Sequence, residues 1–338
     1  MKKFNPGVVP AVRGIVFAAA LLSSGLANAG WFDFNTGKVL ATGGVSMVDG
    51  AGGGGITPWA TITGYETRDG VNGDIHYTYV NLPNYSLNSI GAAVGLFDRV
   101  ELSYANDSLP TGSTFNTVGL LTDGVLGLNT GIKPWNTTIG MNVFGVKVRL
   151  FGEAIYDSDN LIPQVSVGAF YKRNNNPTLI KTLGAAKADD WEAYIAMTKI
   201  FFPISTLVNV TLRYTSANET GLVGFGGPDG DKKQIRPEVS VAYLLNKGTA
   251  IGAEYQKHGN NLNGQSVNLA GLNLTGLTSL IGGNLGTTLT QSDSDWKDIF
   301  VAFFPSKNLS LTLAYAMLGQ ITLTPHQNGF YASVQASF

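Results

Sequence analysis

Apolar and polar side chains alternate along the last segment of the chain, residues 328–338. Phe330, Val334 and Phe338 fall on one face with two alanines, whereas serines, a glutamine and a tyrosine fall on the other. A period of two residues is that of a β-strand with one apolar face. The segment therefore predicts a strand that places one side against an apolar environment.

The same alternation recurs along the chain and predicts an all-β protein of fourteen strands. In one of the clearest, Val208, Val210 and Leu212 alternate with polar residues. The predicted strands are 38–48, 57–66, 74–81, 86–97, 100–104, 138–150, 164–173, 191–200, 208–215, 236–245, 249–258, 295–303, 309–318 and 328–338.

Short turns and long loops separate these strands. If the C-terminus lies in the periplasm, the loops longer than about eight residues lie on the outer side, except residues 152–163. This asymmetry predicts a transmembrane antiparallel up-and-down β-barrel of about fourteen strands. Gly43 and Gly44 interrupt the first strand, and glycines weaken strands. If the first hairpin is instead a gate inside the lumen, the barrel has twelve strands.

The composition agrees with a barrel that spans a membrane. The chain has 13% charged residues, 44% hydrophobic residues, 43 glycines and no cysteine. Soluble domains carry about 25% charged residues and about 7% glycine. A transmembrane barrel accounts for these values, because only every second residue of its strands faces lipid.

The first 29 residues have the pattern of a cleaved signal peptide. Lys2, Lys3 and Arg13 are basic, residues 14–22 are apolar, and residues 27–29 form a small-x-small cleavage site. The apolar run is too short for a membrane anchor, which takes about 20 residues. Residues 30–338 are then one mature barrel domain. Its formal charge is small, which excludes nucleic acid as an electrostatic partner.

The C-terminal strand resembles the assembly signal of Gram-negative outer-membrane barrels. Phe338 is the terminal aromatic residue, and Val334 and Phe330 lie on its face. Ala336 departs from that signal, in which the third residue from the end is often aromatic. The resemblance implies an outer-membrane location, with outer-membrane lipid and the barrel-assembly machinery as partners.

Two further stretches, residues 43–60 and 97–102, resemble an uncharacterised family of Gram-negative outer-membrane barrels known only as a domain of unknown function. Residues 145–150 are more loosely similar to barrels assigned to uptake of aromatic compounds. The family implies a fold and a location. We therefore weigh two functions: a channel for passive uptake of small apolar or aromatic solutes, and a non-transporting barrel that serves envelope structure or adhesion through its loops.

The face opposite the apolar one carries charges of both signs, and these residues are the candidates for the lumen lining. They are Glu101, Lys147, Arg149, Lys172, Glu192, Arg213, Arg236, Glu238, Glu254 and Asp298. A charge-selective pore would show a ring of one sign. A balanced set indicates either internal ion pairs or a pathway for uncharged or amphipathic solutes.

The loop at residues 259–293 is rich in leucine, which is unusual for an outer loop. Such a segment needs apolar cover. It predicts an apolar mouth or plug, and the candidate residues are Leu269, Leu272, Leu277, Leu280 and Leu285. Aromatic residues near strand ends predict interfacial girdles, although β-propensity also enriches tyrosine in strands. They are Tyr104, Tyr171, Trp191, Tyr214, Tyr243, Tyr255 and Tyr315.

The sequence shows no pattern for catalysis, cofactor binding or metal binding. It has three histidines, His76, His258 and His326, and no G-x-S-x-G motif. Three histidines scattered along the chain do not form a recognisable zinc motif. We therefore expect a protein that is not an enzyme and holds neither a cofactor nor a metal.

Overall fold

The computed structural model describes residues 38–65, 70–112, 119–125, 127, 129–133, 137–157, 160–264, 268–269, 272–273 and 291–338. The predicted signal peptide, residues 1–29, lies outside them. So do three of the predicted mouth residues, Leu277, Leu280 and Leu285. Leu269 and Leu272 lie in two short strands, β12 (Asn268–Leu269) and β13 (Leu272–Asn273).

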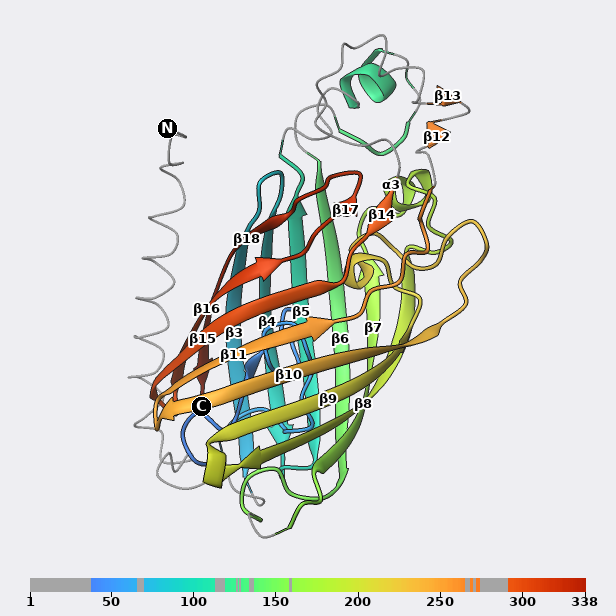
Figure 1. The fold of residues 1–338 in the computed structure, drawn as a ribbon. Coiled ribbons are helices and arrows are strands. Elements are labelled where there is room, and N and C mark those ends of the chain that lie inside the picture. Colours follow the sequence, from blue (N-terminus) through green and yellow to red (C-terminus); the bar gives the residue numbers. More distant parts are fainter. Residues whose placement is uncertain are drawn as a thin grey trace, which may run out of the picture.

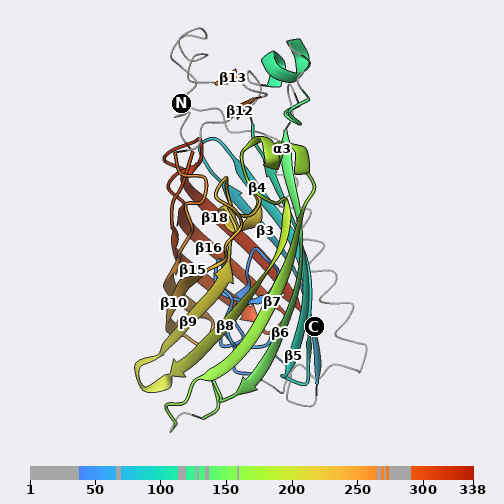
Figure 2. The same ribbon diagram turned by 90° about the vertical axis from the view of Figure 1, so that its right-hand side faces the viewer.

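Twelve antiparallel strands close into one barrel (Figures 1 and 2). They are β3 (Val71–Asn81), β4 (Ser86–Leu96), β5 (Val100–Pro110), β6 (Thr138–Phe151), β7 (Gln164–Asn174), β8 (Asp189–Phe201), β9 (Thr206–Thr215), β10 (Gln234–Asn246), β11 (Thr249–Gln256), β15 (Trp296–Ser306), β16 (Leu309–Met317) and β18 (Asn328–Ser337). Each strand pairs with its neighbours in the chain, and β18 pairs with β3 to close the ring.

Small elements lie inside the barrel or in the connections between its strands. They are β1 (Val45–Ser46), β2 (Gly52–Gly53), β14 (Ser292–Asp293), β17 (Ile321–Thr322), a π-helix (Leu120–Val125), the helix α3 (Pro177–Thr182) and two 3-10 helices (Phe202–Ile204 and Glu219–Gly221). No helix among the described residues is both long enough and apolar enough to cross a membrane.

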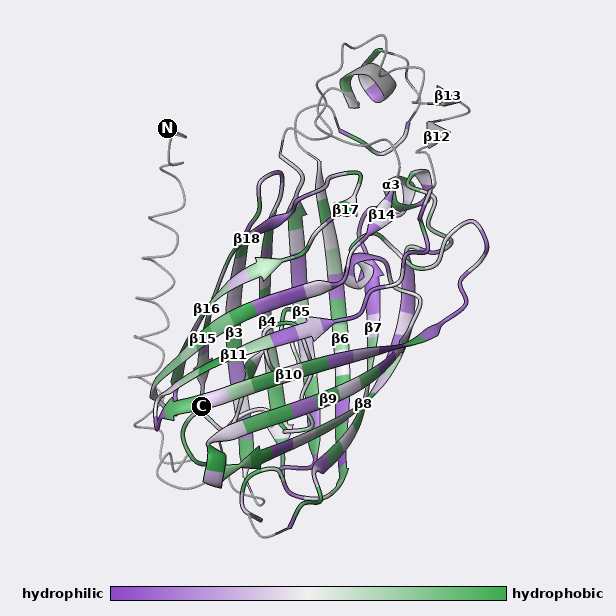
Figure 3. Ribbon diagram, in the orientation of Figure 1, coloured by the Kyte–Doolittle hydropathy of each residue, from purple (hydrophilic) through white to green (hydrophobic). Residues whose placement is uncertain are grey.

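Burial alternates along the barrel strands. Hydrophobic and hydrophilic residues follow one another along the same strands (Figure 3). On β5, Leu102 and Tyr104 are exposed, whereas Glu101 and Ser103 are buried. A closed ring satisfies every backbone group between strands, which lipid requires, and the outward side chains meet lipid. The chain is an outer-membrane β-barrel. Six of the seven predicted girdle residues are exposed on this outer face, namely Tyr104, Tyr171, Trp191, Tyr214, Tyr243 and Tyr315.

The last residue lies at the seam of the barrel. Phe338 donates its backbone N–H to Gly73 O at 2.8 Å and accepts from Gly73 N at 2.7 Å. A Cβ on Gly73 would lie 2.5 Å from the ring of Phe338, so glycine leaves room for this aromatic side chain. The terminal phenylalanine therefore extends the pairing of β18 with β3.

The first two predicted strands, 38–48 and 57–66, are not part of the barrel wall. Residues 41–65 are all buried, and Figure 1 shows this segment, in blue, inside the barrel. We call residues 38–65 the inner segment. It lacks the large alternating apolar side chains that a wall strand must offer to lipid, and Gly44 and Gly50 turn its backbone at positive φ. The count of fourteen was therefore wrong for the wall, and the twelve-strand alternative with an inner hairpin is confirmed.

Candidate functional site

Two carboxylates on opposite walls hold the inner segment across the lumen. Glu101 on β5 accepts hydrogen bonds from Gly52 N (2.9 Å) and Thr63 N (2.8 Å). Glu254 on β11 accepts from Gly55 N (2.6 Å) and Ile56 N (2.9 Å), and from Thr57 Oγ1 (2.6 Å). Five strands separate β5 from β11 in either direction around the ring. The run Gly52–Gly55 therefore bridges the barrel.

Glycine is required in this run because the wall comes very close to its backbone. A Cβ on Gly54 would lie 1.8 Å from Glu254 Oε1, and one on Gly53 would lie 2.4 Å from Thr57 O. A side chain at either position would displace the carboxylate or the turn. The glycine run, which the sequence left open as a turn or a gate, is thus a backbone surface shaped to the carboxylate of Glu254.

A buried charge cluster joins the inner segment to the outer half of the wall. The carboxylate of Asp49 accepts from Lys172 Nζ (2.8 Å) and Arg213 Nη1 (3.2 Å). The same two cations contact Glu192 at 3.0 and 2.6 Å, and Arg213 also contacts Glu238 at 2.5 Å. All five side chains are almost fully buried. Because buried charges need partners, this cluster fixes Asp49 in place.

The inner segment also bonds to the wall through its backbone near Pro58 and Ala60. Ala60 O accepts from Gln164 Nε2 (2.7 Å) and Ser166 Oγ (2.5 Å), and Ala60 N donates to Thr198 Oγ1 (2.7 Å). Pro58 O accepts from Thr211 Oγ1 at 2.8 Å. These contacts add β7, β8 and β9 to the strands that hold the segment.

The start of the inner segment is held at the end of the barrel that carries the C-terminus. Lys38 Nζ lies 3.3 Å from Asp98 Oδ1, and Arg149 also pairs with Asp98. Asp98 lies in the tight turn between β4 and β5, where Phe97 and Asp98 both have positive φ. Two such residues match the twist of a hairpin but are strained without glycine. The strained turn presents the carboxylate to the inner segment.

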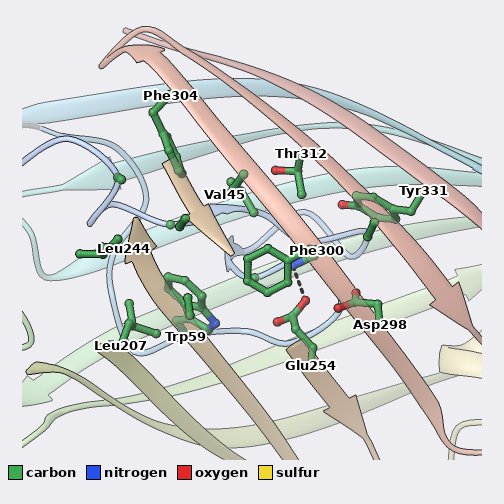
Figure 4. A pocket seen from close by; sticks show the side chains of 18 residues that line it. Val45, Trp59, Leu207, Leu244, Glu254, Asp298, Phe300, Phe304, Thr312 and Tyr331 are labelled. Atoms are coloured by element: carbon green, nitrogen blue, oxygen red, sulfur yellow. Dashed lines mark hydrogen bonds between the residues drawn. The ribbon is translucent and has the colours of Figure 1, made fainter. Parts of the chain in front are cut away.

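A pocket lies between the inner segment and one side of the wall (Figure 4). The space enclosed between its side chains is about 20 Å³, room for about one water molecule. The lining is mostly apolar and includes Trp59, Phe300, Phe304 and Tyr331, with Glu254 and Asp298 as its carboxylates. Among the described residues, no hydrogen bond joins the inner segment to β10, β15 or β16, which form much of this side. On this side the segment is held by β11 alone, through Glu254 and Gln256, as far as the described residues go.

The ten charged residues predicted for the lumen are all buried. The structure pairs most of them: Lys147 with Glu101, Lys172 and Arg213 with Glu192, Arg213 with Glu238, and Arg149 with Asp98 and Glu153. Three have no ion pair in the described part of the chain: Glu254, Asp298 and Arg236. The set contains five residues of each sign, but two acidic residues and one arginine are left outside its ion pairs.

Several polar residues of the lumen were missed by the sequence analysis. Asp74 and His76 on β3 and Asp107 on β5 are buried inward, as is Asp49 of the inner segment. The alternation of β5, continued from Glu101 through Ser103, would have found Asp107. Asp49 could not have been found in this way, because its segment has no strand period.

Apolar side chains cover the outer end of the barrel, but they come from several loops. Ile132, Leu179, Leu183, Leu222 and Leu262 are buried in one cluster. Leu262 belongs to the leucine-rich loop that predicted an apolar mouth, whereas Leu179 and Leu183 come from α3 and its end. The five leucines chosen from the sequence are not among those whose side chains are described. Their role at the mouth stays a prediction.

Outside the barrel strands, the structure gathers His258 with two acidic residues. Ligand atoms of Glu219, His258 and Asp293 all lie within 4.8 Å of one another. His258 Nδ1 is 3.0 Å from Asp293 Oδ1, and its Nε2 is 3.0 Å from Gln256 Oε1. Burial and the adjacent Asp293 raise the pKa of Glu219 well above its usual range. A histidine nitrogen and two carboxylates are donor types that hold zinc, a grouping that sequence spacing could not reveal.

Comparison with known proteins identifies the family of this chain. A family model described as "Protein of unknown function (DUF3034)" matches residues 42–335. The chain belongs to the DUF3034 family. The match spans most of the inner segment and all twelve barrel strands of this DUF3034 protein. No curated protein matches it.

Solved barrels are similar to the DUF3034 protein in fold only. The KdgM porin has a TM-score of 0.43 at 10% identity, with 78% of this chain and 99% of that chain covered. The NanC porin has a TM-score of 0.44 at 8% identity, covering 78% and 98%. The COG4313 outer membrane channel from Pseudomonas putida F1 has 0.40 at 10%, covering 83% and 97%. These values are too low to support any inference about a solute.

Proposed function

We propose that this DUF3034 protein is an outer-membrane channel for passive uptake of small apolar or aromatic solutes, and that the inner segment is its gate. The observation that carries this proposal is the position of the pocket. It is lined by aromatic side chains, and it lies beside β10, β15 and β16, to which the described part of the inner segment makes no hydrogen bond, although Glu254 of β11 between them holds the segment. Ligand sites are concave and mostly apolar, with a few polar groups.

The gate is proposed to open when the inner segment leaves its hydrogen bonds to β5, β7, β8, β9 and β11. The inner segment contacts the wall through hydrogen bonds and ion pairs. Water and ions can take the place of these contacts when the lumen opens. The proposal includes passage and no catalytic step, in keeping with the absence of a nucleophile motif from the sequence.

An engineered disulfide tests the gate directly, because the chain has no cysteine of its own. A Cβ on Gly50 would lie 3.2 Å from Ala105 Cβ on β5, close to the Cβ separation of a disulfide. The double variant Gly50→Cys/Ala105→Cys would tie the inner segment to the wall. We expect solute flux into liposomes to fall when this variant is oxidised and to recover after reduction.

A second disulfide supplies the control. A Cβ on Gly52 would lie 3.2 Å from Thr63 Cβ, and both residues belong to the inner segment. Gly52→Cys/Thr63→Cys therefore staples the segment internally without tying it to the wall, and oxidation should leave flux unchanged. Equal flux in the oxidised and reduced forms of the wall-tethered variant would refute the gate.

The rival function is a barrel that does not transport and acts through its structure or its loops. Two observations favour it: the bonds between the inner segment and strands on most sides of the wall, and the apolar cover at the outer end. This function requires no flux from the wild-type protein or from either reduced variant, with normal folding of all three.

A further inference from the structure

Asp49 is a carboxylate of the inner segment that lies among cations of the barrel wall. It belongs to a tight turn, in which Gly50 N donates to Met47 O at 2.9 Å. Its Oδ2 accepts from Lys172 Nζ and from Arg213 Nη1, whereas its Oδ1 has no hydrogen-bond partner among the described residues. The proposed gate is thus held at these two cations by a single oxygen atom of one side chain.

A third cation next to this pair has no carboxylate partner in the described part of the chain. Arg236 on β10 is directly opposite Arg213 on β9 in the strand register, and both side chains are buried. Like charges directly opposite each other on neighbouring strands are destabilising. Nη1 of Arg236 donates to Ala217 O at 2.6 Å, but Nε and Nη2 find no hydrogen-bond partner among the same residues. These two atoms form one edge of the guanidinium, and such an edge can bind both oxygens of a carboxylate.

The charges around Asp49 balance only while the inner segment is in place. The wall contributes three cations and two carboxylates, namely Lys172, Arg213, Arg236, Glu192 and Glu238. Asp49 is the third carboxylate. Asp107 on β5 is also buried, but it forms no ion pair with any of these cations in the described part of the chain. When the segment leaves, one positive charge loses its counterpart, and uncompensated buried charge is costly. An open gate therefore favours a solute that brings a carboxylate of its own.

Two aromatic rings lie against the same cations. The ring centroid of Phe170 on β7 is 5.5 Å from Lys172 Nζ and 5.5 Å from Arg213 Cζ. Tyr194 on β8 stacks on Phe170 with 5.2 Å between the ring centroids, and its buried hydroxyl has no hydrogen-bond partner among the described residues. Strands β7 to β10 lie side by side in the ring (Figure 2). Cations and aromatic rings therefore share one stretch of the wall, which suits a carboxylate attached to a ring.

We infer that this stretch of the wall binds small aromatic carboxylates in the place that Asp49 occupies while the gate is closed. The inference names the substrate class and rests on the proposed function, because the place becomes free only when the turn at residues 47–50 leaves the wall. The carboxylate of the solute takes over the contacts of Asp49 and uses the free edge of Arg236, and its ring lies against Phe170. Such a solute competes with Asp49 and favours the open gate, since it binds only the open state.

Three ligands with the same ring and different charge test the inference. Benzoate is an anion at neutral pH, benzyl alcohol is neutral, and benzylamine is a cation. We would measure their binding to the full mature chain, refolded in detergent micelles, by isothermal titration calorimetry. Benzoate should bind about tenfold or more tightly than benzyl alcohol, as hydrogen bonds to a charged group imply, and benzylamine more weakly than both. Equal affinity for benzoate and the alcohol, or no binding of benzoate, would overturn the inference.

The wall-tethering disulfide shows whether benzoate binds where Asp49 lies. Residue 50 follows Asp49 directly, so oxidised Gly50→Cys/Ala105→Cys holds the turn on the wall and keeps Asp49 among the cations. Oxidation should abolish benzoate binding, and reduction should restore it. The control disulfide, Gly52→Cys/Thr63→Cys, should bind benzoate alike in both forms. Benzoate binding that survives oxidation of the wall-tethered variant would place the site elsewhere and overturn the inference.

Two substitutions assign the affinity to particular charges. Asp49→Asn removes the competing carboxylate, so benzoate should bind about tenfold more tightly. Thr57→Val is its control, because it removes a hydrogen bond to Glu254 and no contact of Asp49, and it should change the affinity much less. Arg236→Gln should remove most of the advantage of benzoate over benzyl alcohol, whereas Lys187→Gln, from an exposed ion pair, should keep it. Unchanged benzoate affinity in both Asp49→Asn and Arg236→Gln would overturn the inference.

Flux measurements separate this inference from the proposed function. If liposomes take up benzoate and benzyl alcohol equally, the channel stands and the carboxylate preference fails. If the micellar protein binds benzoate selectively and oxidation blocks that binding, but no liposome shows flux, the carboxylate site stands and the channel fails.

Discussion

Glu101 and Glu254 face each other across the lumen and hold the two ends of one glycine run. Glu101 accepts from Gly52 N, and Glu254 accepts from Gly55 N. Hydrogen bonds to a charged acceptor are about twice as strong as neutral ones. The position of the inner segment thus depends on two carboxylates that the sequence places far apart.

Replacing both carboxylates should loosen the inner segment. In Glu101→Gln/Glu254→Gln the hydrogen bonds to backbone N–H groups become neutral, which should cost about 1–2 kcal/mol at Glu254. The loss at Glu101 should be about 3–5 kcal/mol, because buried Lys147 also loses its carboxylate partner. We expect faster amide hydrogen exchange at residues 52–57 and more frequent conductance openings in planar bilayers. Asp107→Asn, which touches no part of this glycine run, should change neither. Unchanged exchange in the double variant would show that other contacts hold the segment.

Neighbouring glycines should respond differently to alanine. A Cβ on Gly54 would lie 1.8 Å from Glu254 Oε1, whereas the closest atom to a Cβ on Gly55 is 3.3 Å away. Gly54→Ala should therefore cost about 1–3 kcal/mol, as overpacking does, and Gly55→Ala should cost much less. Urea unfolding of the refolded protein, together with amide exchange of the inner segment, compares the two. Equal effects would mean that the run tolerates side chains and is not shaped to Glu254.

Loss of Lys147 should destabilise the folded barrel. Its Nζ donates to Gly52 O, Thr61 O and Glu101 Oε2 at 2.7–2.9 Å, and it is fully buried. Lys147→Met leaves Glu101 buried without a cation, which costs about 3–5 kcal/mol. The temperature of the heat-modifiable gel shift should fall.

A surface lysine provides the comparison for that substitution. Lys257 pairs with Asp295 at 3.1 Å, but both side chains are partly exposed. Lys257→Met should cost less than about 1 kcal/mol, because exposed ion pairs contribute little. If both variants shift the gel transition equally, the buried network is not the source of stability.

The outer loops should pack less firmly as the pH rises. Burial and Asp293 raise the pKa of Glu219, so the folded state favours its protonated form. Stability from this group is full below the pKa of the unfolded chain and is lost as the pH rises through the folded pKa. Proteolysis of the loop at residues 218–233, in buffer with a chelator, should therefore accelerate between acidic and neutral pH.

Glu219→Gln should remove most of that pH dependence, since glutamine does not titrate. Asp231→Asn is the control, because Asp231 is exposed in the same loop and should leave the pH profile in place. A steep profile that persists in Glu219→Gln would assign the effect to another group.

Removal of the terminal residue should impair assembly. Phe338 exchanges two backbone hydrogen bonds with Gly73 at the closing seam. Deleting it removes these bonds and the aromatic terminus, so less protein should reach the outer membrane in heat-modifiable form. Deleting Leu269 to Leu285 is a loop control that leaves the seam intact. Normal assembly without Phe338 would show that the rest of β18 suffices.

The barrel itself could be predicted because its physical cause is local. Strands such as β4 and β16 must turn one face to lipid, so every second residue along them is apolar. The predicted strands 86–97 and 309–318 differ from Ser86–Leu96 and Leu309–Met317 by one residue at the end. β5 extends past its predicted end at residue 104 to Pro110. The prediction stopped early because the outward residues there, such as Asn106 and Ser108, are no longer apolar.

The candidate site could be predicted only in part. The alternation along the strands placed Glu254 and Asp298 among ten charged residues on the inward face, but it assigned no partner to either. Ion pairs in the lumen form between residues that are distant in sequence, as Asp49 with Lys172 and Arg213 shows. The cluster of Glu219, His258 and Asp293 likewise joins three separate stretches of chain.

By itself, the sequence determined the wall: the β class, the face that meets lipid, the face that meets the lumen and the aromatic end at the seam. These follow from residues one or two positions apart. Only the tertiary structure decided that residues 38–65 fill the lumen, which carboxylates hold them, and where an apolar pocket with unpaired polar groups remains. Such features depend on which strands face each other in the closed ring. The alternation of neighbouring residues does not contain this information.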